Sequence, residues 1–228
     1  MINERFFPDS ETTAAALAEA LAAVLSQEVM KKGQASIAVS GGRTPRLVLP
    51  KLARLPVPWD RVHVTLIDER WVDVENEESN EKLVRECLLQ QGAGAARFTG
   101  LKTSWPMVTQ GRIETEQRLS EVPFPLDAVY LGMGEDGHIA SLFPGNPAAL
   151  KAPGRCVAVP EEDGRKPRIS MTLSALLDAS RLFLMISGYK KFSVYEEAKK
   201  SGEAEDLPVR SILKQDRVPV EVFVSRQD

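Results

Sequence analysis

Residues 126–144 read Leu-Asp-Ala-Val-Tyr-Leu-Gly-Met-Gly-Glu-Asp-Gly-His-Ile-Ala-Ser-Leu-Phe-Pro, and this stretch shows how the chain is organised. Its first part, 126–131, is a short apolar run of the kind that forms a buried strand. Three glycines in 132–137 then predict a tight backbone turn, which ends at His138. A buried strand followed by such a turn is typical of the edge at which α/β proteins bind ligands.

The same pattern occurs twice more along the chain. The run 35–39 is followed by the turn Ser-Gly-Gly-Arg-Thr-Pro at 40–45, and the β-branched run 62–67 is followed by Asp-Glu-Arg-Trp at 68–71. Because the carboxyl ends of parallel strands meet at one edge of a sheet, we expect all three loops to lie together there.

The remaining pattern alternates helices and strands. Helical spacing predicts a helix that Asp9 or Ser10 caps and Gly33 ends, and a second that begins at Thr44 and Pro45 and is broken or kinked by Pro50. Further helices are expected at 79–89, 107–120, 174–179 and 189–200, strands at 156–159, 168–172, 182–186 and 220–224, and a loop at 92–100. This alternation predicts an α/β fold with a largely parallel sheet, covered by helices on both faces. Since no repeat or long linker interrupts it, we expect one domain over 1–228.

Composition narrows the function classes. The chain has 228 residues, 43% of them hydrophobic, and a net charge of −3, so nothing draws it as a whole toward nucleic acid. Cys87 and Cys156 are isolated and are expected to be reduced thiols of a cytoplasmic protein. Residues 1–5 have no apolar core of the signal-peptide type, and no apolar run approaches the roughly 18 residues that span a bilayer. We therefore expect no membrane partner.

His138 is the candidate general base. A neutral imidazole accepts a proton near pH 7, and Asp136, on the same turn, can fix the tautomer or stabilise the charged ring. The alternative is that His138 caps a short helix beginning there. The other histidine, His63, lies inside a strand and is interpreted as an ordinary buried side chain. Two isolated histidines and two isolated cysteines have no metal-ligand spacing, so no metal site is expected.

The turn at 41–44 is the candidate phosphate site. Its glycines let backbone N–H groups point inward, and the following helix start favours an anion, although an ordinary strand-to-helix turn would have the same sequence. The turn lacks the GxxxxGK[ST] pattern of a nucleotide P-loop. The residues 132–137 match GxGxxG, but Glu135 and Asp136 would place negative charge where a dinucleotide needs the opposite.

Other charged residues follow predicted strands or open a helix. Asp68 and Arg70 are expected to reach the ligand edge, or to belong to a solvated loop. Lys190 and Lys191 open a helix, where cations are unfavourable unless an anion faces them; solvated lysines are the alternative.

Taken together, these segments resemble the 6-phosphogluconolactonases, the sugar-lactone hydrolases of the pentose phosphate pathway. The matching motifs run in order across almost the whole chain: SGGRTP at 40–45, DERWV at 68–72, SN at 79–80, GMGEDGHIASLFPG at 132–145, PRIS at 167–170 and GYKK at 188–191.

The resemblance implies a Rossmann-like three-layer fold, related to that of glucosamine-6-phosphate deaminases. It implies that His138 acts as base with Asp136 beside it, and that Arg70 lies near the substrate. Phosphate would be held by Gly41, Gly42, Arg43 and Thr44 of the turn, by Arg168 and by Lys190 or Lys191. Relatives often have serine at position 43, so whether the Arg43 side chain joins this site is left open.

In the mechanism that the resemblance implies, water activated by His138 attacks the lactone carbonyl of 6-phospho-D-glucono-1,5-lactone. Backbone N–H groups of the glycine turn at Gly134, or Arg70, would stabilise the oxyanion. No cofactor is required, and a monomer or weak homodimer is expected.

One alternative is an amino sugar phosphate deaminase that uses Asp68 as its base. That activity is disfavoured because Leu142-Phe143-Pro144 stands where deaminases carry Asn-Glu-Pro. The other alternative is a non-catalytic sugar-phosphate sensor, which would not keep the histidine and its carboxylate.

Overall fold

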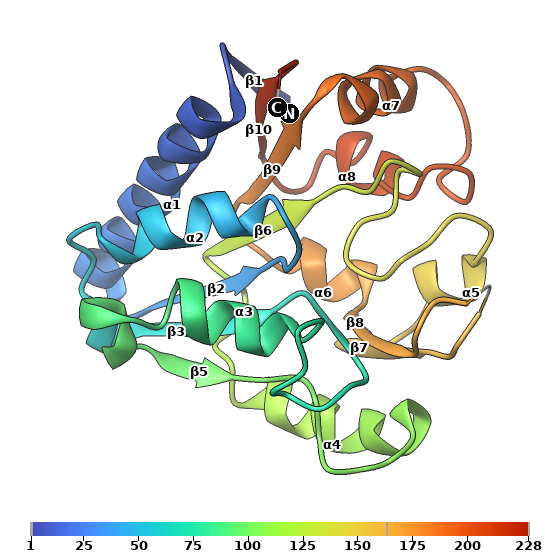
Figure 1. Ribbon diagram of the computed structural model, residues 1–228, viewed down its shortest axis with the longest axis horizontal. Helices are drawn as coiled ribbons and strands as arrows, with labels where there is room; N and C mark the ends of the chain where they lie inside the picture. Colours follow the sequence, from blue (N-terminus) through green and yellow to red (C-terminus); the bar gives the residue numbers. More distant parts are fainter. Residues whose placement is uncertain (1, 163, 228) are drawn as a thin grey trace.

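The centre of the protein is a parallel β-sheet, seen in a computed structural model that describes residues 2–162 and 164–227. Seven strands lie in the order β1-β10-β9-β6-β2-β3-β5, and every neighbouring pair is parallel (Figure 1). Their bounds are β1 Ile2–Phe7, β2 Ala35–Val39, β3 Val62–Leu66, β5 Arg97–Thr99, β6 Ala128–Gly132, β9 Leu182–Ser187 and β10 Val220–Ser225. The predicted α/β class is confirmed.

Helices cover both faces of this sheet. Every residue of β2 and β3 is buried, and since alternate side chains of a strand point to opposite faces, neither face is open to water. α1 packs on the sheet beside α2, and α7 packs on β9 and β10. The helices are α1 Ser10–Lys32, α2 Pro45–Ala53, α3 Asn80–Cys87, α4 Val108–Ser120, α5 Pro147–Leu150, α6 Leu173–Leu177, α7 Tyr189–Lys199 and α8 Arg210–Leu213, with short 3₁₀ turns η1 Trp59–Arg61 and η2 Gln91–Ala95.

The longest helix, α1, is capped as the sequence predicts. The Asp9 side chain accepts a hydrogen bond from the Thr12 N–H at its start, and Gly33, at φ 81°, ends it in the left-handed conformation. Among the described residues, α1 is the one helix long and apolar enough to cross a membrane by length and composition. Its leucines Leu17, Leu21 and Leu25 are, however, fully buried in the core of this fold.

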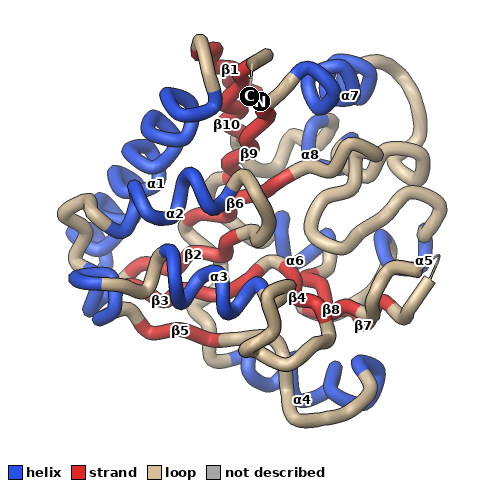
Figure 2. Tube along the Cα trace, in the orientation of Figure 1, coloured by secondary structure: helices blue, strands red, loops and turns tan. Residues whose placement is uncertain are grey.

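A second, three-stranded sheet lies beside the first (Figure 2). It is antiparallel, in the order β4-β8-β7, with bounds β4 Asp68–Arg70, β7 Cys156–Val159 and β8 Arg168–Met171. The prediction that 68–71 is a loop was therefore wrong for its first three residues. Ile67 joins the two sheets, because its N–H donates to the Val39 carbonyl and its own carbonyl accepts from the Met171 N–H. The chain thus passes from β3 directly into β4.

Three other details differ from the sequence-based expectation, and one alternative is excluded. Strands β1 and β5 were not predicted, because β1 is exposed at nearly every position and β5 has three residues inside a glycine-rich segment. The helix α2 continues three residues past Pro50, because Val48, Leu49 and Leu52 are buried and their packing outweighs the lost hydrogen bond. The alternative that His138 caps a helix is wrong, because no helix lies in the described residues between β6 and α5.

Candidate active site

Three loops meet at the carboxyl edge of the main sheet, as expected. β6, β2 and β3 are neighbours, so the segments that follow them converge around a pocket of about 380 Å³. Most of the residues selected from the sequence line this pocket: Gly41, Gly42, Arg43, Thr44, Asp68, Arg70, Gly134, His138, Arg168 and Lys191. The imidazole and the candidate phosphate turn therefore share one cleft. Two selected residues, Asp136 and Lys190, do not line it.

His138 is held in place by a carboxylate and an aromatic ring. Its Nδ1 lies 2.5 Å from Asp136 Oδ1, and its ring centroid lies 4.7 Å from that of Phe143. Partial burial alone would raise the pKa of Asp136, but the hydrogen bonds with His138 outweigh it and hold that pKa at about 2. An ionised Asp136 fixes the imidazole proton on Nδ1, so Nε2 is the nitrogen left to accept a proton. The His138 side chain is 30% exposed, so water can reach it.

Gly134 makes room for that imidazole. A Cβ atom built on Gly134 would lie 2.2 Å from both Cε1 and Nδ1 of His138, so any side chain at this position would displace the ring. The turn is closed by hydrogen bonds from the Gly134 N–H to the His138 carbonyl and from the Gly137 N–H to the Gly134 carbonyl. Gly137 has φ 80°, a conformation that glycine adopts most readily.

The candidate phosphate turn has a structure suited to an anion. Gly42 has φ 104°, and Pro45 is the first residue of α2. The predicted cap at Thr44 is not formed, because the residue is helical and its side chain makes no capping hydrogen bond. The start of α2 therefore keeps its positive potential.

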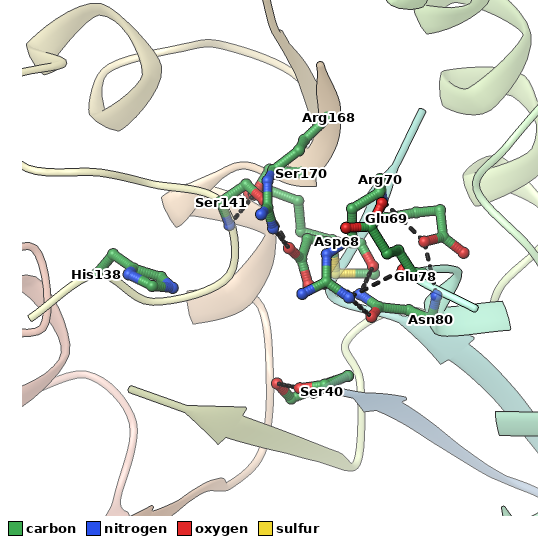
Figure 3. A network of polar contacts seen from close by, with 12 residues as sticks. Ser40, Asp68, Glu69, Arg70, Glu78, Asn80, His138, Ser141, Arg168 and Ser170 are labelled. Atoms are coloured by element: carbon green, nitrogen blue, oxygen red, sulfur yellow. Dashed lines mark hydrogen bonds and ion pairs between the residues drawn. The ribbon is translucent and has the colours of Figure 1, made fainter. Parts of the chain in front are cut away.

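Asn80 connects this turn to the second sheet. Its side-chain Oδ1 accepts a hydrogen bond of 2.6 Å from Arg70, and its Nδ2 donates to the backbone carbonyl of Asp68 at 2.9 Å (Figure 3). A Cβ atom on Gly41 would lie 1.8 Å from Asn80 Oδ1, so the carboxamide rests directly against the turn. From the sequence, Asn80 was placed at a helix start and in the motif SN at 79–80, but this contact with the turn was not predicted. Gly41, which has no side chain and so lets the Asn80 carboxamide approach, is the feature of the sequence that could have indicated this contact.

Two arginines lie side by side at the far end of the pocket. Strand register pairs Arg70 with Arg168 across β4 and β8, and Asp68 with Ser170. Arg168 Nη1 lies 3.7 Å from Asp68 Oδ2, which also accepts a 2.5 Å hydrogen bond from the buried Ser141 hydroxyl. Burial lowers the pKa of the Arg168 guanidinium. Figure 3 shows Asp68, Arg70 and Arg168 together, across from His138.

Glu69, next to these residues, points away from the pocket and supports it from behind. Its Oε1 accepts hydrogen bonds from the backbone N–H groups of Arg70 and Asn80, and its Oε2 accepts from the Ser79 hydroxyl and the Glu81 N–H. Burial raises the pKa of Glu69 to about 7, while these four donors favour the ionised form. Glu69 therefore anchors the start of α3, and Asn80 with it.

The charge of the pocket is opposite to that of the whole chain. Its lining includes four cationic side chains and two carboxylates: Arg43, Arg70, Arg168 and Lys191, with Asp68 and Glu135. A net charge of −3 for the chain thus accompanies a site that attracts anions. Lys190 pairs with Glu135 at 3.8 Å and its side chain is 80% exposed, so Lys191 is the lysine of the pair that reaches this pocket.

The other residues singled out from the sequence lie elsewhere. His63 Nε2 is 2.8 Å from the Thr99 hydroxyl, inside the sheet, as expected for an ordinary buried histidine. Within residues 2–162 and 164–227, no three His, Cys, Asp or Glu side chains gather in a way that would hold a metal ion. Cys87 and Cys156 are both free thiols.

Comparisons with known proteins agree with this geometry. The chain is 37% identical to the 6-phosphogluconolactonase of Rhizobium meliloti (strain 1021) over 226 residues, which cover 97% of each protein. The crystal structure of a 6-phosphogluconolactonase from Shewanella baltica OS155 has a TM-score of 0.95 and 37% identity, and the match covers 98% of this chain and 97% of the other. A glucosamine-6-phosphate deaminase matches with a TM-score of 0.80 at 18% identity over 96% of each chain, which shows a common fold.

The family model described as glucosamine-6-phosphate isomerases/6-phosphogluconolactonase matches residues 8–220. That range includes the phosphate turn, the Asn80 contact, the histidine turn and both arginines of the pocket. The chain therefore belongs to the glucosamine-6-phosphate isomerase/6-phosphogluconolactonase family.

Proposed function

We propose that this protein hydrolyses 6-phospho-D-glucono-1,5-lactone to 6-phospho-D-gluconate, with His138 as the general base. The observation that carries the proposal is the single pocket lined by both the phosphate turn and His138. Its volume of about 380 Å³ accommodates one phosphorylated sugar. The reaction belongs to the oxidative pentose phosphate pathway, and the cytoplasm is the proposed compartment, in keeping with two free thiols.

In the proposed mechanism the substrate phosphoryl group binds at Gly42 and Thr44, with Lys191 and Arg168 beside it. The lactone ring then extends toward His138, whose Nε2 removes a proton from water as the water oxygen attacks C1. Asp136 stabilises the imidazolium that forms. General-base assistance of this kind contributes about 10²–10⁴-fold in rate.

The tetrahedral intermediate carries a negative charge on the former carbonyl oxygen. Arg70 supplies positive charge to stabilise it, and backbone N–H groups of the glycine turn are further donors. Collapse of the intermediate breaks the bond from C1 to the ring oxygen, which leaves as the C5 hydroxyl after taking the proton from the imidazolium.

The deaminase alternative would require Asp68 as a base. The Asp68 carboxylate already accepts hydrogen bonds from Ser141 and Asn80 and lies 3.7 Å from Arg168 Nη1. These contacts direct the Asp68 oxygens toward protein donors rather than toward a substrate proton. The ring that packs on His138 is Phe143, at the position where deaminases carry the glutamate.

The test follows freshly prepared 6-phosphogluconolactone by NMR with and without the protein. We expect disappearance of the δ-lactone well above the spontaneous rate, and no ammonia from glucosamine 6-phosphate in a parallel assay. Ammonia release without lactone turnover would reverse the assignment.

A further inference from the structure

A second groove of about 450 Å³ lies beside the candidate active site. It is lined by the turn before α2, by α2 itself, by the start of α3 and by the segment between β7 and β8. Three arginines line both this groove and the active-site pocket: Arg43, and Arg70 and Arg168, which are drawn in Figure 3. Arg46, Arg165 and Lys166 line this groove alone.

The lining of this groove is strongly cationic. It has six basic side chains and two acidic ones: Arg43, Arg46, Arg70, Arg165, Lys166 and Arg168, with Glu77 and Glu78. Both acids are already paired, since Glu77 contacts Lys82 at 2.6 Å and Glu78 contacts Lys166. Lys166 is held by Glu78 and Arg168 lies 3.7 Å from Asp68, so within the described residues the cations of this groove that no carboxylate contacts are Arg43, Arg46 and Arg70.

Arg43 and Arg46 are placed where the fold itself disfavours them. They lie at the N-terminal end of α2, where the helix dipole repels cations and where no acidic residue is present. Within the described residues neither side chain forms a hydrogen bond or an ion pair; the Glu77 carboxylate attracts Arg46 but already contacts Lys82 at 2.6 Å. A bound anion would relieve this repulsion, and guanidinium groups are suited to bidentate contacts with phosphoryl oxygens.

We propose that this groove binds a second small phosphorylated anion, at the same time as the active-site pocket holds its own. The two sites share Arg43, Arg70 and Arg168, so their occupants compete for the same positive charge. Each anion therefore weakens the binding of the other, and a phosphorylated anion in the groove inhibits the enzyme without displacing its substrate. The kinetic part of this inference rests on the proposed lactonase activity; the binding part does not.

Calorimetric titration with inorganic pyrophosphate tests the binding. We expect two sites in the unmodified protein and one in the Arg46→Glu variant, since Arg46 lines the groove and not the active-site pocket. Arg46→Gln should weaken the second site by at least about tenfold, the loss of one charge-assisted contact. The matched control is Arg54→Glu, at the exposed other end of α2 and outside both cavities, which should keep two sites. One site in the unmodified protein, or two unchanged sites in Arg46→Glu, would overturn the inference.

A second arm identifies the source of the phosphoryl group. Titration with 6-phosphogluconate in place of pyrophosphate gives two sites if the reaction product can occupy the groove. It gives one site if only inorganic phosphates fit there, and pyrophosphate must then still show two sites. Kinetically, pyrophosphate should inhibit lactone hydrolysis in a mixed pattern that becomes competitive in Arg46→Glu. Two pyrophosphate sites in a protein without lactonase activity would refute the proposed function and leave the groove standing. Full lactonase activity with only one pyrophosphate site would refute the second anion site in the groove and leave the proposed function standing.

Discussion

The contact between Gly41 and Asn80 offers the sharpest test of how the pocket is held together. An alanine Cβ at position 41 would lie 1.8 Å from Asn80 Oδ1 and 2.1 Å from its Cγ, far inside van der Waals contact. Gly41→Ala should therefore push the carboxamide aside. Asn80 would then lose its 2.6 Å hydrogen bond from Arg70 and its 2.9 Å hydrogen bond to the Asp68 carbonyl. Both the turn and the arginine would move.

The size of the effect follows from the cost of overpacking, which is about 1–3 kcal/mol. If that cost falls on the arrangement that binds substrate, KM rises about 5- to 150-fold, since 1.4 kcal/mol is a factor of ten. Asn80→Ala alone should also raise KM, because Arg70 loses its side-chain acceptor. The atoms that obstruct Cβ, however, all belong to the carboxamide and are absent from alanine.

The assay is a double-mutant cycle of initial lactonase rates for the unmodified protein, both single variants and the double variant. We expect Gly41→Ala to add little damage in the Asn80→Ala background, which gives a coupling free energy of about 1–2 kcal/mol. Gly92→Ala is the control, because its Cβ would meet nothing within 4 Å, and it should be silent. If Gly41→Ala is equally harmful with and without the Asn80 carboxamide, the reasoning is refuted.

Four other variants test the roles assigned above. Lys191→Ala should raise KM for the lactone at least about tenfold through loss of one phosphate contact, whereas Lys190→Ala, exposed and outside the pocket, should change it less than about twofold; equal effects would contradict the assignment. Arg168→Ala should raise KM more than it lowers kcat, because phosphate is held alike in the ground state and the transition state. An unchanged KM would remove Arg168 from the phosphate site. Burial, aided by the nearby Arg97, lowers the pKa of His63 to about 4, so the unfolded chain binds the extra proton first and stability should fall as the pH drops from about 6.5 toward 4. Urea unfolding of His63→Gln across that range should show a flatter profile, and an unaltered slope would exclude His63 as its cause.

Much of the fold follows from local pattern. Buried apolar runs such as 35–39 and 128–132 could be identified as strands because their residues are apolar and glycine turns follow them. That the loops after β2, β3 and β6 meet is a general property of parallel sheets. The second sheet could not be foreseen, because β4 is three residues long and pairs with β8, far along the chain. Its existence depends on long-range backbone hydrogen bonds, which local patterns do not encode.

Some residues of the candidate site could likewise be predicted from the sequence and others could not. His138, Asp136 and Gly134 lie close together in sequence, and so do Gly41, Gly42 and Thr44, so each of the two groups could be predicted from its own short segment. Asn80 and Ser141 contribute by contacts across the molecule, to Gly41 and to Asp68, and no spacing rule identifies such partners. The difference between Lys190 and Lys191 depends on the rotation of α7, which tertiary packing sets.

The central claim is that His138 removes a proton from water in the same pocket that holds the phosphoryl group. The most direct measurement compares His138→Ala with the unmodified protein, by lactone turnover corrected for spontaneous hydrolysis and by calorimetric binding of 6-phosphogluconate. We expect turnover to fall by at least about 10²-fold while the affinity for the phosphosugar changes little. Turnover close to that of the unmodified protein would contradict the role of His138. A parallel loss of binding would instead show that the imidazole serves to hold the ligand.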